Sequence, residues 1–81
     1  MEIKVLGSGC ANCKRLEVLV HEVVAETGAE ASVAKVTDFK EIASYGILAT
    51  PGLVVNGEVK SAGRIPSKTE IAGWLTAAKA R

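Results

Sequence analysis

Two cysteines separated by two residues are the most reactive feature of this sequence. Cys10 and Cys13 flank Ala11 and Asn12, and the chain has no other cysteine. A thiolate is the nucleophile in disulfide exchange, and the free N–H groups at a helix N-terminus stabilise it. Because this spacing brings both sulfurs onto one helical turn, the pair predicts thiol–disulfide exchange. Cys10, the outer residue, would attack a disulfide, and the partly buried Cys13 would resolve the mixed disulfide.

Other uses of the pair are a structural bridge, a metal site or an oxidation sensor. A disulfide across two residues closes a small loop and adds little stability. A structural zinc site usually takes four Cys or His ligands, and the chain has only these cysteines and His21. We interpret His21 as an ordinary surface or boundary residue and assign no metal ligand. Two thiolates also suit Cu(I), so a copper-type binding or chaperone protein is the alternative function.

Length and charge restrict the class of protein further. The chain has 81 residues, 48% of them hydrophobic and 23% charged, so we expect one compact domain over residues 1–81. Its net charge of +1 gives no long-range field for nucleic acid or anionic lipid. No apolar run approaches the roughly 20 residues that span a bilayer, and no signal peptide is evident. We therefore expect a cytoplasmic protein without membrane or nucleic-acid partners. No cofactor is expected.

Short strands and helices alternate around the cysteines. Residues 2–6 predict a strand, and the glycine-rich turn after it leads to Cys10. A helix is expected from Cys10 to a cap at Gly28, with a stripe of apolar residues at Leu16, Leu19, Val20, Val23 and Val24. Residues 29–36 predict a second strand. This arrangement places the cysteine pair at the junction of the first strand and the first helix.

The second half of the chain predicts a short helix, a hairpin and a final helix. Asp38 is a predicted N-cap for the short helix, whose apolar side would hold Phe39, Ile42 and Ala43 before Gly46 ends it. Asn56-Gly57 lies between two apolar runs and is a strong hairpin signal. The pattern from Ser67 to Glu70 is a capping box that starts the last helix. The order β-α-β-α-β-β-α predicts a four-stranded mixed sheet with helices on both faces.

A proline precedes the buried run of the hairpin, in the sequence Thr50-Pro51-Gly52. Proline donates no hydrogen bond to a sheet, so Pro51 belongs at the first position of the strand. Bonds before proline are the only common cis peptides. An ordinary trans turn is the alternative, but the position between a helix and a hairpin favours a cis bond.

Together, these motifs resemble the thioredoxin/glutaredoxin superfamily, and most closely the prokaryotic small redox-active disulfide proteins. The resemblance rests on Gly-x-Gly-Cys-Ala-Asn-Cys, on Thr-Pro-Gly-Leu-Val-Val some 40 residues later, on Asn56-Gly57 and on Gly63. It implies a minimal thioredoxin-like fold with a cis Thr50-Pro51 bond packed beside Cys10. It also implies that backbone near Thr50 pairs with a substrate polypeptide, and that Gly63 keeps this surface open.

The resemblance further implies a protein-disulfide reductase or electron carrier of thioredoxin type. Its partners would be disulfide-containing proteins and a reductase, and it would act as a monomer. Thioredoxins carry Trp before the first cysteine and Gly-Pro between the pair. Because this chain departs from both features, the resemblance does not indicate which kind of reductase restores its dithiol. Here those positions hold Gly9 and Ala11-Asn12. The charges with which glutaredoxins bind glutathione are not evident, and no buried carboxylate for proton transfer is assigned.

Overall fold

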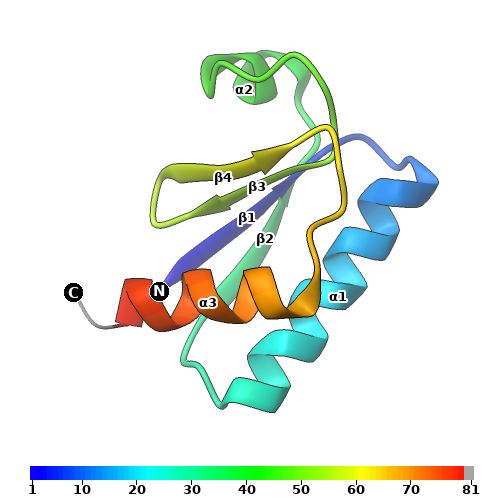
Figure 1. Cartoon of the computed structure of the whole chain (residues 1–81). Coiled ribbons are helices and arrows are strands. Elements are labelled where there is room, and N and C mark those ends of the chain that lie inside the picture. The colour runs from blue at the N-terminus through cyan, green and yellow to red at the C-terminus, as the bar shows by residue number, and fades with distance from the viewer. Residues whose placement is uncertain (80–81) are drawn as a thin grey trace.

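A computed structural model describes residues 1–79 of the chain, so residues 80–81 of the expected domain lie outside the described residues. The elements are β1 (Glu2–Leu6), α1 (Ala11–Thr27), β2 (Ser32–Val36), α2 (Phe39–Ser44), β3 (Gly52–Val55), β4 (Glu58–Ala62) and α3 (Lys68–Lys79) (Figure 1). This order is the predicted one. Within residues 1–79, no helix is both long enough and apolar enough to cross a membrane.

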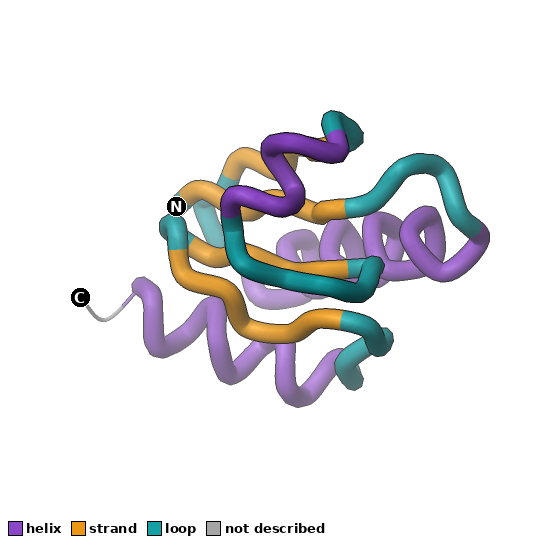
Figure 2. Tube along the Cα trace, turned by 90° about the horizontal axis from the view of Figure 1, so that it is seen from above, coloured by secondary structure: helices purple, strands orange, loops and turns teal. Residues whose placement is uncertain are grey.

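The strands form one mixed sheet in the order β2-β1-β3-β4. β1 is parallel to β2 and antiparallel to β3, and β3 is antiparallel to β4. The turn between β3 and β4 has positive φ angles at Asn56 (49°) and Gly57 (81°), as the two-residue hairpin turn that favours Asn-Gly requires. Helices α1 and α3 lie on one side of the sheet and α2 lies on the other (Figures 1 and 2). The predicted fold class is confirmed.

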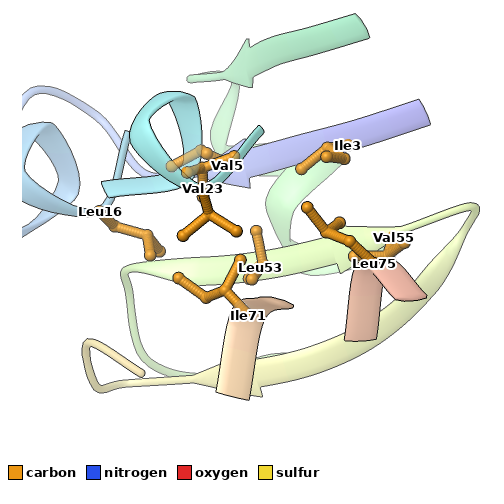
Figure 3. Close-up of a cluster of buried hydrophobic side chains, with 9 residues drawn as sticks. Ile3, Val5, Leu16, Val23, Leu53, Val55, Ile71 and Leu75 are labelled. Carbon is orange, nitrogen blue, oxygen red and sulfur yellow. The ribbon is translucent and has the colours of Figure 1, made fainter. Parts of the chain in front are cut away.

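The larger hydrophobic cluster fills the space between the sheet and the two long helices. Figure 3 shows its side chains converging from β1, β3, α1 and α3. The buried members are Ile3, Val5, Leu16, Val20, Val23, Leu53, Val55, Ile71 and Leu75. They include three residues of the predicted apolar stripe of α1, whereas Leu19 and Val24 are partly buried beside the cluster. Burial of this one face therefore holds both long helices on the sheet.

A smaller cluster lies under α2, on the opposite face. It contains Leu6, Val36, Ile42 and Val54. Of the predicted apolar side of this helix only Ile42 is buried, because Phe39 is 83% exposed and Ala43 is exposed as well. Helix α2 has only six residues, and Ile42 is its buried residue. Phe39 and Ile42 are three residues apart and share a side of the helix by spacing, but only Ile42 is buried on the sheet.

The predicted helix ends are confirmed by backbone conformation at Gly28 and by hydrogen bonds at Asp38 and Ser67. Gly28 closes α1 in the left-handed conformation, and the carboxylate of Asp38 accepts from the Lys40 amide at 2.8 Å. At the start of α3, the Glu70 amide donates to Ser67 Oγ, and the Ser67 amide donates to the Glu70 carboxylate. This reciprocal pair is a capping box.

Strand β2 begins at Ser32, later than the predicted start at residue 29. Its pairing with β1 begins at the register pair of Glu2 and Ser32. Because β1 itself starts at Glu2, the residues before Ser32 have no strand partner.

Candidate active site

Three loops meet at one end of the sheet (Figures 1 and 2), and they carry the residues predicted to act except Cys13, which lies in the first turn of α1. One loop joins β1 to α1, one leads from α2 into β3, and one follows β4. The β-α-β crossover and the hairpin bring these loops together, because β1 and β4 end where β3 begins. The topology thus places the cysteine motif and the Thr-Pro motif close together in space.

Cys10 and Cys13 form a disulfide, with their Cα atoms 5.1 Å apart. The two residues differ in access to solvent. Cys10 is exposed at the start of α1, whereas Cys13 is 5% exposed and belongs to the buried face of the helix. An incoming disulfide can therefore reach Cys10 and not Cys13.

The first turn of α1 favours a negative charge on Cys10 Sγ. Cys10 is the N-cap residue, and its Sγ accepts a hydrogen bond from the Cys13 amide at 3.1 Å. The first turn contains no acidic residue, and Lys14 and Arg15 follow the pair as exposed cations. The positive end of the helix and this N–H group both stabilise a thiolate over a thiol. The N-cap position is thus suited to an attacking sulfur.

Gly7 lets the backbone of the loop approach the buried sulfur. Its φ is +155°, and a Cβ atom at this position would overlap Cys13 Sγ and lie 3.6 Å from the Cβ of Thr50. The Gly7 amide donates to the Val36 carbonyl at 2.9 Å, which fixes the loop to the end of β2. Any side chain at Gly7 would displace Cys13.

The Thr50-Pro51 peptide bond is cis, as the resemblance implies. Thr50 is exposed and Pro51 is buried at the entry to β3. The Pro51 carbonyl accepts from the Gly63 amide at 2.9 Å. Gly63 has a φ of +76°, and a Cβ there would lie 3.0 Å from Ala49. The structure therefore places Gly63 beside the Thr-Pro loop.

A groove of about 310 Å³ runs from the Thr-Pro loop toward α2. It is lined by Ser8, Phe39, Ile42, Ala43, Ile47, Leu48, Ala49 and Thr50. Leu48 is fully exposed and Phe39 is nearly so, an unusual position for large apolar side chains. The sequence analysis did not identify this groove. Its only sequence signal is the apolar Ile47-Leu48-Ala49 segment directly before the Thr-Pro motif.

A second, much smaller cavity lies beside Cys13 and was also missed. It is lined by Val5, Gly7, Gly9, Cys13, Lys14 and Lys35. Lys35 comes from β2, far from the cysteines in sequence, and its Nζ lies 3.6 Å from the carboxylate of Glu17. His21 is exposed, as expected. Across residues 1–79, no cluster of three or more His, Cys, Asp or Glu side chains could hold a metal ion.

A disulfide at the N-terminus of the first helix, beside a cis-proline loop on a small mixed sheet, defines a thiol–disulfide oxidoreductase. Residues 1–76 match the family model of the thioredoxin domain, and the chain belongs to this family. A thioredoxin of Methanothermobacter thermautotrophicus is 45% identical over 71 residues, which cover 88% of this chain and 92% of that protein. A thioredoxin of Methanocaldococcus jannaschii is 38% identical over 69 residues, covering 85% and 79%.

These findings confirm the predicted superfamily and its redox chemistry. The class has two general kinds of partner, namely proteins with a reducible disulfide and a reductase that restores the dithiol.

Proposed function

We propose that this protein reduces disulfides of other proteins, with Cys10 as the attacking residue and Cys13 as the resolving residue. The observation that carries the proposal is the unequal exposure of the two sulfurs at the start of α1. Cys10 is open to solvent and capped by an N–H donor, whereas Cys13 is buried. In the reduced protein, the Cys10 thiolate attacks a target disulfide, and Cys13 then displaces the target from Cys10.

We further propose that the target polypeptide lies along the exposed backbone at Thr50, as an added strand would. Pro51 and Gly63 shape this surface, since the hydrogen bond between them holds the two loops together. Side chains next to the target cysteine would enter the groove between Leu48 and Phe39. The protein would work as a cytoplasmic monomer of one domain. A closely spaced pair in a reducing compartment favours such turnover over a permanent bridge.

The test is a redox titration in defined dithiothreitol buffers with free thiols counted at each point. We expect a reversible two-electron transition for the native protein. The Cys13→Ser variant should accumulate a mixed disulfide at Cys10, and Cys10→Ser should accumulate none. A midpoint more oxidising than that of the target proteins would contradict the reductase role. Thiols that never form the intramolecular disulfide, or that co-purify with a protecting metal, would favour the copper-type alternative.

A further inference from the structure

The loop between β4 and α3, residues 63–67, meets the Thr-Pro loop at its first residue, Gly63. Figure 1 shows this loop running from the end of β4 to the start of α3. The Gly63 amide donates to the Pro51 carbonyl at 2.9 Å, and a Cβ on Gly63 would lie 3.0 Å from Ala49. The position of Gly63 therefore affects how the backbone at Thr50 is presented to a target.

The two ends of this loop differ in how they are fixed. At the far end, the Pro66 side chain is fully buried, and Ser67 begins the capping box of α3. The near end is not buried, because Ala62, Gly63 and Arg64 are all exposed. Glycine has more accessible backbone conformations than any other residue, so the hydrogen bond from the Gly63 amide needs a restraint at a neighbouring residue.

Arg64 supplies that restraint through Glu70. The guanidinium nitrogens Nη1 and Nη2 of Arg64 donate to the two carboxylate oxygens of Glu70 at 3.1 and 2.8 Å. A bidentate pair of this kind fixes the orientation of the guanidinium as well as its distance. Glu70 also accepts from the Ser67 amide at 3.2 Å, and Ile71 beside it is fully buried in the larger cluster. The ion pair therefore ties the residue after Gly63 to the first turn of a helix that the core holds in place.

We propose that Arg64 is a positioning residue for target binding, acting through Gly63 on the Thr-Pro loop. The proposal rests on the proposed function, in which the target polypeptide lies along the backbone at Thr50. With the ion pair formed, the Gly63 amide stays directed at the Pro51 carbonyl, and the Thr-Pro loop keeps the conformation that a target strand meets. Without the pair, residues 63–64 sample other conformations, and binding has to order them first. The effect therefore falls on binding of the target and not on exchange between the sulfurs.

The experiment compares Arg64→Met with the native protein in hydrogen exchange and in kinetics. We expect the Gly63 amide to exchange about threefold faster, because an exposed ion pair adds a small free energy to local stability. The Gly7 amide, which donates to the Val36 carbonyl in a different loop, should keep its native rate. KM for insulin, a protein disulfide, should rise about threefold at unchanged kcat, and the rate with Ellman's reagent, a small aromatic disulfide, should stay native. Arg64→Lys should give intermediate values, since lysine keeps the charge without the bidentate geometry.

Lys68→Met is the matched control, because it removes another exposed cation at the start of α3. The ammonium of Lys68 lies 3.3 Å from Glu22 and 2.9 Å from Glu26, so its ion pairs join α3 to α1 and not to the loop. The exchange of the Gly63 amide and KM for insulin should both be native in this variant. The proposal is overturned if Arg64→Met leaves either value native, or if Lys68→Met changes both equally. Failure of the proposed function gives a different result, since the native protein itself would then leave insulin unreduced.

Discussion

The two faces of the sheet differ in how much they bury and in what they leave exposed. The face under α1 and α3 holds the larger hydrophobic cluster, with residues from both helices and two strands. The face under α2 holds four buried hydrophobic residues among residues 1–79 and borders an open groove. Most of the hydrophobic stabilisation therefore comes from the face under α1 and α3. The face under α2 leaves apolar side chains exposed to solvent near the disulfide. This difference can be tested by substitutions on each side.

Leu53→Ala should give the largest effect on the free energy of unfolding. Leu53 is fully buried in the larger cluster, and a buried Leu→Ala change costs about 3 kcal/mol through lost burial and the cavity it leaves. Urea unfolding followed by Trp74 fluorescence measures the change, because Trp74 packs against this cluster. A matched control is Val59→Ala, at a more exposed position of the sheet. A loss below about 1 kcal/mol for Leu53→Ala would contradict the comparison.

Ile42→Ala should cost about 2 kcal/mol, at the low end for such a change. The reason is that Ile42 is 7% exposed and α2 has no second buried residue. We expect hydrogen exchange to become faster first in α2, while amides of α1 and α3 keep their protection. Equal acceleration in all three helices would show instead that the two faces unfold as one unit.

Leu48→Ser should change function more than stability. Its side chain is fully exposed beside the Thr-Pro loop, so the free energy of unfolding should stay within about 0.5 kcal/mol. We expect KM for a protein disulfide to rise about fivefold, because an apolar contact worth about 1 kcal/mol is lost. The rate with a small aromatic disulfide should not change. Val18→Ser is the control, since Val18 is an exposed residue of α1 outside the groove. An equal effect from both variants would exclude a specific role for the groove.

Glu70→Gln should give the smallest effect, at the exposed start of α3. Two hydrogen bonds from the Arg64 guanidinium, together with the Ser67 amide, lower the pKa of Glu70 to about 2. A lowered pKa adds stability above the ordinary value of 4.5, and this contribution is lost as pH falls toward about 2. The difference in unfolding free energy between the native protein and Glu70→Gln should therefore shrink over that range. Arg64→Met should raise the pKa of Glu70, measured by NMR titration, and a difference that stays constant with pH would contradict the assignment.

Local sequence patterns were sufficient for most of the fold. The caps at Asp38 and Gly28 and the turn at Asn56-Gly57 are each decided by residues a few positions apart. The position of Cys10 at the N-terminus of α1 follows from the same kind of local signal. Such features are predictable because the interacting groups are neighbours in the chain.

The features that were missed depend on tertiary contacts. Phe39 fits an apolar helix face by spacing, but in the folded protein only Ile42 of that face is buried against the sheet. Lys35 reaches the cavity beside Cys13 only through the parallel register that pairs it with Val5. A short window of residues determines neither the register of two strands nor which side chains of a helix pack against a sheet. The cysteine pair was therefore predictable, and its charged surroundings were not.

The central position of β1 has a consequence for synthesis of the protein on the ribosome. β1 is made before β3, yet Ile3 pairs with Val55 of β3. As a growing chain, β1 can pair only with β2 until the hairpin has left the exit tunnel. During that interval one edge of β1, with its apolar residues, has no strand partner and is open to wrong pairing with other chains. Emergence of the β3–β4 hairpin from the tunnel therefore closes the sheet and removes this risk of aggregation.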